Sequence, residues 1–319
     1  MATVQQALLK PFRTFEEQLQ ILRGRGLQVD NDAGALATLQ RVGYYRLAGY
    51  FYPLRRMMGD GTPTRRDEFV DGASLALVVS LYEFDKSLRL LVLDAIERLE
   101  VAIRVAIAYR LGRLHPEAHL DPRFLDARFC QARRANEPSA HEKWRQRLDE
   151  AFRKSSEDFV EHHRTRYHGR MPIWVAIELW DFGMLSFFYQ GLAYKHRDAI
   201  ARGVGQLKPD QLVSWLRTLN FVRNVCAHHS RLWNRSVPEV PSIPSADQIP
   251  MLAHVATVGA EYRLYGALSC MRYLLRSVHA DGDWHGKLAT HIEQFPQSNL
   301  VSLSAAGFPH NWRQQALWS

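Results

Sequence analysis

The sequence has few cysteines and no long apolar run. Its 319 residues contain three cysteines, Cys130, Cys226 and Cys270, which are odd in number and widely separated. This pattern favours neither a disulfide framework nor the paired spacing of a zinc site. No run of about 18 apolar residues occurs, and the start lacks a basic flank followed by an apolar stretch, as a membrane span or an export signal would need. We therefore expect a cytoplasmic protein with no membrane partner.

Glycine and proline are not abundant either, and alternating strand patterns of useful length are missing. The 19 glycines and 14 prolines exclude collagen-like and low-complexity classes, and 46% apolar residues can form a substantial core. At about 150 residues per domain, the length indicates two domains or one large domain.

Helical periods dominate the chain instead. Apolar residues recur every three or four positions from Ser74 to about Arg113, which predicts the longest helix. Thr14 and Glu17 have the spacing of a capping box, and Pro209 suits the first turn of a helix. We therefore predict an all-α fold. Further helices are expected from Asp30–Asp32 to Val42, after Pro172 with a break near Gly183, from Val258 to Val278 and from Trp284, and loops are expected at 56–68 and across the four prolines after Arg235.

Basic residues outnumber acidic residues, and most of the basic residues are arginine. The net charge is +8, and 34 of the 41 basic residues are arginine. Because arginine binds phosphate through a planar fork of donors and stacks on bases, nucleic acid is the first candidate partner. A solvated basic surface without a partner remains the alternative.

The sharpest local feature is residues 217–235, with four arginines, two histidines and no acidic residue. Within it, Arg223 and His228 show the pattern of arginine, four to six residues, then histidine, which metal-independent helical ribonucleases use. Spacing alone proves little, because this composition gives roughly four to five such pairs by chance. Four other pairs occur, namely Arg110 with His115, Arg113 with His119, Arg134 with His141 and Arg272 with His279.

Helix geometry adds a constraint on this pair. At about 100° per residue, Asn224 and His228 share one helix face, whereas Arg223 and His228 diverge by about 140°. For Arg223 and His228 to meet at one phosphate, the helix must end or distort between them, or the two groups must come from different copies of the chain. The second option predicts a homodimer.

Five stretches in a fixed order resemble the Abi-like abortive-infection family of bacteria, whose core is a HEPN helical domain. The resemblance covers about residues 10–312 and places the HEPN catalytic arginine on Arg223, its polar neighbour on Asn224 and the catalytic histidine on His228. The other Arg and His pairs lie outside the signature. The stretches are RNVCAHHSRLWNR at 223–235, VGYYRLAGYFYPLR at 42–55, YEFDKSLRLLVLDAIERLEVAIR at 82–104, WVAIELWDFGMLSFFY at 174–189 and AAGFPHNW at 305–312, and the first of them also contains His229, Arg231 and Asn234, which have no assigned role.

The resemblance implies a fold and an activity. It implies a HEPN-like bundle, which we place at residues 71–280 with a polar, mobile, basic insertion at about 114–170, an N-terminal helical segment (1–70) packed on it and a C-terminal helical tail (281–319). The implied activity is cleavage of RNA without metal or cofactor by a toxin or phage-defence effector. An RNA or a protein could inhibit it. The alternative is a helical RNA-binding or dimerisation module without catalysis.

Several further residues are candidates for supporting roles. Glu178 lies in an apolar helical stretch, where a buried carboxylate needs a basic partner, and the Arg223 segment could supply it. Glu100 and Arg104 are expected to form an ordinary intrahelical pair, with support of the site as the lesser alternative. Residues 123–170 carry twelve basic against eight acidic residues, which suits an RNA-tracking surface. The arginines we expect to bind RNA there are Arg133, Arg134, Arg145 and Arg147.

Overall fold

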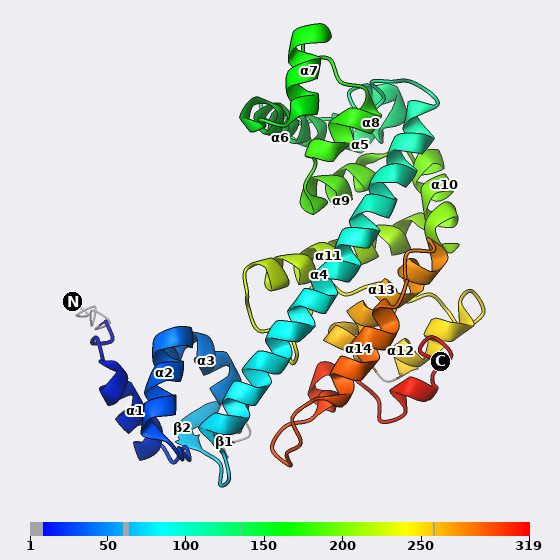
Figure 1. Ribbon diagram of the computed structural model, residues 1–319. Helices are drawn as coiled ribbons and strands as arrows, with labels where there is room; N and C mark the ends of the chain where they lie inside the picture. Colours follow the sequence, from blue (N-terminus) through cyan, green and yellow to red (C-terminus); the bar gives the residue numbers. More distant parts are fainter. Residues whose placement is uncertain (1–8, 60–63, 135, 258) are drawn as a thin grey trace, which may run out of the picture. The chain divides into compact units, whose positions relative to one another are not determined.

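The computed structural model describes residues 9–59, 64–134, 136–257 and 259–319, and helices dominate it (Figure 1). The prediction of an all-α fold is confirmed. The chain forms two compact units. The first comprises the described residues up to Lys86 together with Gln294–Ser302, and the second comprises Ser87–Glu293 and Leu303–Ser319. None of the described helices combines the length and the apolar character that a membrane crossing requires.

The first unit begins with helices that start where the sequence predicts. Thr14 caps α1, because the Glu17 amide donates to its hydroxyl (3.2 Å) while the Glu17 carboxylate accepts from the Thr14 amide (2.9 Å), and this reciprocal pair confirms the capping box. Asn31 caps α2 by accepting a hydrogen bond from the Gly34 amide at its side-chain oxygen. The elements here are α1 Phe15–Gly24, α2 Asp32–Val42, α3 Tyr44–Phe51, η1 Tyr52–Leu54, β1 Arg55–Met57, β2 Arg65–Phe69 and the first part of α4 Leu75–Gly112.

The expected loop at 56–68 is wrong in part. β1 and β2 pair antiparallel, with Arg55 opposite Phe69 and an irregular register between Arg55 and Met57. Only Phe69 of β2 is buried. Strand β2 therefore lacks the apolar alternation that would signal it, and its pairing rests on the backbone. Residues 60–63 of the expected loop lie outside the described residues.

The second unit is built on the rest of α4. The apolar residues that face the core are buried at a helical period along α4, including Leu88, Ala95 and Leu99, which confirms the long predicted helix. The other elements are η2 Pro122–Phe124, α5 Ala127–Cys130, α6 Ala140–Lys154, α7 Asp158–Arg166, α8 Ile173–Ala176, η3 Ile177–Leu179, α9 Phe182–Gly191, α10 Tyr194–Gly205, α11 Pro209–Ala227, η4 Pro250–Leu252, α12 Ala253–Thr257, η5 Ala260–Tyr262, α13 Leu264–Ser277, α14 Trp284–Glu293, η6 Leu303–Ala306 and η7 Trp312–Gln314.

The basic segment after α4 contributes to the core as well as to the surface. Helix α6 buries Trp144, whose indole N–H donates to the Met184 carbonyl (3.2 Å) and whose ring packs edge-on against Trp180. The predicted break in the next helical run falls at Trp180 and Asp181, just before Gly183, where η3 ends and α9 begins.

Helix α11 is the central element of the site described below. Pro209 occupies its first turn, as predicted, and the helix packs against α9, α10 and α13. The proline-rich chain after Arg235 is not helical, and its Ser242 carbonyl accepts a hydrogen bond from the Trp215 indole of α11 (2.9 Å). Helix α13 begins at Leu264, and the predicted start at Val258 lies outside the described residues.

Candidate active site

Helix α11 ends at the histidine pair in a tightly bonded turn. His228 is the capping residue, the His229 amide donates to the Cys226 carbonyl (2.9 Å), and the Ser230 amide donates to the Val225 carbonyl (2.9 Å). This pair of backbone hydrogen bonds is a Schellman motif. His229 has a φ of +55°, in the left-handed region that favours glycine. The turn therefore fixes the backbone that carries His228 to the end of the helix.

Arg223 and His228 are linked through Asn224. The Arg223 Nη1 donates to the Asn224 Oδ1 (3.3 Å), and the His228 amide donates to the Asn224 carbonyl (3.0 Å). The helix thus stays regular through Ala227 and ends at His228 without distortion between the pair. His228 is exposed, and Arg223 and Asn224 are half-buried. Within the described chain, no hydrogen bond joins Arg223 directly to His228.

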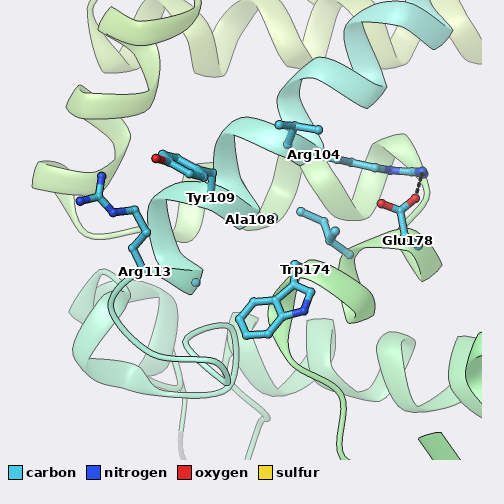
Figure 2. Close-up of a pocket in the computed structure, with 9 residues that line it drawn as sticks. Arg104, Ala108, Tyr109, Arg113, Trp174 and Glu178 are labelled. Atoms are coloured by element: carbon cyan, nitrogen blue, oxygen red, sulfur yellow. Dashed lines mark hydrogen bonds and ion pairs between the residues drawn. The ribbon is translucent and has the colours of Figure 1, made fainter. Parts of the chain in front are cut away.

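An ion network on α4 faces Arg223. Arg104 Nη2 lies 2.5 Å from Glu100 Oε1 and 2.6 Å from the Trp180 carbonyl. Its Nη1 lies 3.3 Å from Glu178 Oε2, the contact drawn in Figure 2. Burial raises the pKa of the Glu100 carboxyl, while the charges of Arg104 and Arg223 act to lower it. Glu100 is therefore close enough to Arg223 for their charges to interact, and the expected intrahelical pair with Arg104 is confirmed.

The structure corrects the expected position of Glu178. Its side chain is 52% exposed rather than buried, and its partner is Arg104 of α4 rather than a residue of the Arg223 segment. The short turn η3 directs this carboxylate out of the apolar run. The sequence did not indicate that Glu100 would be the carboxylate acting on Arg223, because their proximity depends on how α4 and α11 pack.

A second acidic residue, Asp181, lies near α11 at the start of α9. Asp181 caps α9 by accepting from the Met184 amide (2.7 Å), and its Oδ2 pairs with Arg147 Nη2 (2.9 Å). A Cβ built on Gly183 would lie 3.1 Å from the Asp181 Oδ1 and 3.6 Å from the Asn220 Oδ1. Glycine at this position thus lets the first turn of α9 approach Asn220 of α11, one turn before Arg223.

Three of the four arginines expected to bind RNA lie near Glu137, and the fourth, Arg147, lies at Asp181. Arg147 is held at Asp181, close to α11. Arg145 lines a cavity with three carboxylates, Glu137, Glu142 and Asp149, and Arg134 pairs with Glu137 at 3.6 Å, whereas Arg133 lines a larger cavity of about 600 Å³ together with Arg128 and Lys143.

The remaining residues of the signature surround the turn after α11. His229 is exposed, Arg231 is half-buried, and the Asn234 Oδ1 is buried without a hydrogen-bond partner among the described residues. Sequence reasoning missed Arg89, which is 5% exposed and donates from Nη1 to the Ser230 carbonyl (3.4 Å). An arginine next to Leu88, on the apolar face of α4, is the signal that could have revealed it.

Across residues 9–59, 64–134, 136–257 and 259–319, no group of three or more His, Cys, Asp or Glu side chains is arranged to hold a metal ion. Cys226 and Cys270 are buried, and Cys130 is half-buried.

Comparison with known proteins places the chain in a family. The model of the family described as Abi-like protein matches residues 37–234, well over half of the chain. This region contains Glu100, Arg104, Glu178, Arg223 and His228, and it ends at Asn234. No curated protein and no solved structure matches the chain. The chain therefore belongs to the Abi-like protein family.

Proposed function

We propose that this protein is a metal-independent endoribonuclease of the HEPN type that acts as an abortive-infection effector in phage defence. The observation that carries the proposal is the arrangement at the end of α11. There Arg223 is bonded to Asn224, which shares a helix face with the exposed His228. Family membership supports the role in defence.

The chemistry follows from the two side chains. The ribose 2′-oxygen attacks the adjacent phosphorus, so a 2′-oxygen–phosphorus bond forms and the bond from phosphorus to the 5′-oxygen breaks. His228 moves the proton from the 2′-hydroxyl to the leaving 5′-oxygen, because an imidazole can accept a proton at one nitrogen and donate one from the other. Arg223 stabilises the charge that develops on the phosphoryl oxygens. The products are a 2′,3′-cyclic phosphate and a 5′-hydroxyl.

The regular helix between Arg223 and His228 favours a site shared by two chains. Since α11 is undistorted here, the two side chains leave the helix about 140° apart. A two-fold interface that brings together two copies of this segment would place the arginine of one chain near the histidine of the other. Mixing Arg223→Ala with His228→Ala chains should then restore part of the activity that neither variant has. Full activity of a wild type that is monomeric by sedimentation would contradict the shared site.

A cleavage assay on the purified chain tests the proposal. Wild type should cut RNA in the presence of EDTA. Loss of general acid–base catalysis in His228→Ala should slow cleavage by about 10²- to 10⁴-fold, and Arg223→Ala should also be impaired, while both variants keep the helical circular dichroism of wild type. RNA binding without cleavage by wild type would instead support the non-catalytic alternative. Cleavage that requires added magnesium would contradict the mechanism.

A further inference from the structure

A solvent-exposed apolar face runs along the C-terminal half of α4. Val101, Val105 and Tyr109 follow one another at four-residue spacing and are 52%, 62% and 67% exposed, and Trp174 of α8, also 52% exposed, lies beside this face. Between the two helices is a cavity of about 420 Å³, within the range of about 300–1,000 Å³ typical of ligand sites. Figure 2 shows Tyr109 and Arg113 at one end of this cavity and Arg104 with Glu178 at the other.

The indole of Trp174 lies close against the end of α4. A Cβ built on Gly112, the last residue of α4, would lie 2.9 Å from Trp174 Cε3 and 3.3 Å from its Cζ3. Only glycine therefore allows the ring to rest against the helix at this point. The other seven tryptophans of the chain are at most 8% exposed. Trp174 is thus the exposed tryptophan among these eight.

Glu178 pairs with Arg104 at one end of the cavity, whereas the arginines at the Tyr109 end have no such partner among the described residues. Arg113 is exposed, and its guanidinium lies over the Tyr109 ring, 5.5 Å from the centroid. Arg110, one turn after Ala106, has a buried Nε without a hydrogen-bond partner. Within the described part of the chain, neither Arg110 nor Arg113 has an acidic partner. Arginine stacked on an aromatic ring still offers its N–H donors to a phosphate.

A second cavity adjoins the first on the other side of Tyr109. It measures about 460 Å³ and lies between α4 and α10, with Tyr109, Arg110 and Arg113 on its α4 side and Ile200 and Val204 on its α10 side. Tyr109 and Arg113 line both cavities. An aromatic ring between two cavities, with arginines beside it, suits neighbouring bases of one strand and the phosphate that joins them.

We propose that the Tyr109–Trp174 cavity binds unpaired bases of a single-stranded RNA, with Arg110 and Arg113 on its phosphates. This inference rests on the proposed function, because it names the form of RNA that reaches the candidate active site. Arg104 lines the cavity and also pairs with Glu100, the carboxylate that faces Arg223. In this proposal a strand held at Trp174 extends past Arg104 towards the Arg223 segment.

A second copy of the chain is the less favourable occupant of this surface. In a two-fold interface the same patch meets itself, so Arg110 and Arg113 of each copy would meet like charges, and the carboxylate that lines the cavity, Glu178, is already paired with Arg104. A polyanionic strand, by contrast, supplies the missing negative charge, and its bases supply the apolar faces that cover Tyr109 and Trp174.

Binding can be measured separately from cleavage on a strand that cannot be cut. The probe is a short, fluorescently labelled single-stranded RNA whose 2′-hydroxyls are methylated, which removes the attacking nucleophile. The variants are Tyr109→Leu, Trp174→Leu, Tyr109→Phe and Trp174→Phe in the full chain. Leucine keeps apolar area without a ring, and phenylalanine keeps the ring. Tyr262→Leu is the matched control, since Tyr262 is 57% exposed and lies outside both cavities.

We expect each leucine variant to bind the probe roughly 5- to 150-fold more weakly, which corresponds to the loss of one stacked base. Both phenylalanine variants and Tyr262→Leu should bind as wild type does. Binding should also protect wild-type tryptophan fluorescence from acrylamide quenching, because Trp174 is the accessible indole. Arg113→Gln should lower the slope of log affinity against log salt by about 0.7, the value of one phosphate contact on a single strand.

Other outcomes overturn the inference. One is that wild type does not bind the probe, and another is that the leucine variants bind it as tightly as wild type does. A third is a leucine variant that sediments as a monomer where wild type is a dimer, while its affinity for RNA is unchanged. That result would make the patch an interface between two copies of the chain. If wild type binds the probe through this cavity but cleaves no RNA, the inference stands and the proposed function fails. If wild type cleaves RNA and the leucine variants bind and cleave equally well, the proposed function stands and the inference fails.

Discussion

Glu100 offers a direct way to test the electrostatics around Arg223. Its carboxylate lies 2.5 Å from Arg104 Nη2, and the two side chains are only 17% and 18% exposed. In Glu100→Ala the guanidinium of Arg104 loses a charge-assisted hydrogen bond, which typically contributes about 1.5–3 kcal/mol. Arg104 keeps Glu178 and the Trp180 carbonyl as acceptors, so the loss should stay below the roughly 3–5 kcal/mol of a fully orphaned buried charge. We therefore expect Glu100→Ala to lower the free energy of unfolding by about 2 kcal/mol.

Glu100→Gln should cost less than Glu100→Ala. Burial raises the pKa of the Glu100 carboxyl despite the opposing effect of Arg104 and Arg223, so the site favours the neutral form. Glutamine keeps an acceptor oxygen for Arg104 and carries no charge. A carboxyl whose folded pKa is raised gives its full stability below the unfolded pKa, near 4.5, and loses it as the pH rises through the folded value. The stability of Glu100→Gln relative to wild type should therefore rise as the pH increases from about 4 to 7.

Urea unfolding followed by tryptophan fluorescence measures both variants. All eight tryptophans lie in the second unit, which also contains Glu100, so the signal reports that unit alone. If Glu100→Gln is as unstable as Glu100→Ala at pH 7, the negative charge itself stabilises the network, and the site does not favour a neutral group at position 100. A difference between Glu100→Gln and wild type that does not change with pH would refute the assigned effect of burial.

Three further predictions use the same fluorescence assay. Asp181→Ala should be about 1 kcal/mol less stable than Asp181→Asn, since asparagine still caps α9; equal stability would mean that the cap contributes nothing. His279→Gly should be more stable by up to about 1 kcal/mol, because this exposed residue has a φ of +54° at the end of α13, and a loss of stability would contradict this assignment of strain. Burial lowers the pKa of His119 from 6.5 to about 4, so stability should be full above pH 6.5 and fall by up to about 3 kcal/mol as the pH drops to about 4. A His119→Phe chain with an unchanged pH profile would show that another group is responsible.

The sequence predicted those features that local interactions determine. The capping box of Thr14 and Glu17, the start of α11 at Pro209 and the length of α4 depend on residues within a few turns of one another, and all three are present. The β1–β2 hairpin was missed because its strands are short and charged, so that backbone pairing rather than an apolar pattern stabilises them.

The candidate site was predictable only in part. The Arg223 and His228 segment was found from its composition and its resemblance to the family signature, and its helical position follows from the period of α11. The acidic partner could not be found this way, because the apolar stretch around Glu178 favoured that residue and Glu100 was expected to pair with Arg104 on its own helix. Only the packing of α4 beside α11 shows that Glu100 acts on Arg223 and that Glu178 is exposed. The same packing explains why Arg89 reaches Ser230.

The end groups of the cleaved RNA provide the most direct test of the central claim, that Arg223 and His228 cut RNA by attack of the 2′-hydroxyl. RNA is incubated in EDTA with wild type, His228→Ala, Arg223→Ala and, as a control, His279→Ala, which alters an exposed histidine in the corresponding turn after α13. Mass spectrometry then identifies the new ends. We expect 2′,3′-cyclic phosphate ends from wild type and from His279→Ala, and we expect these ends to be lost in His228→Ala and Arg223→Ala. The proposed mechanism would be contradicted if His228→Ala formed as much cyclic phosphate as wild type, or if wild type produced 3′-hydroxyl ends.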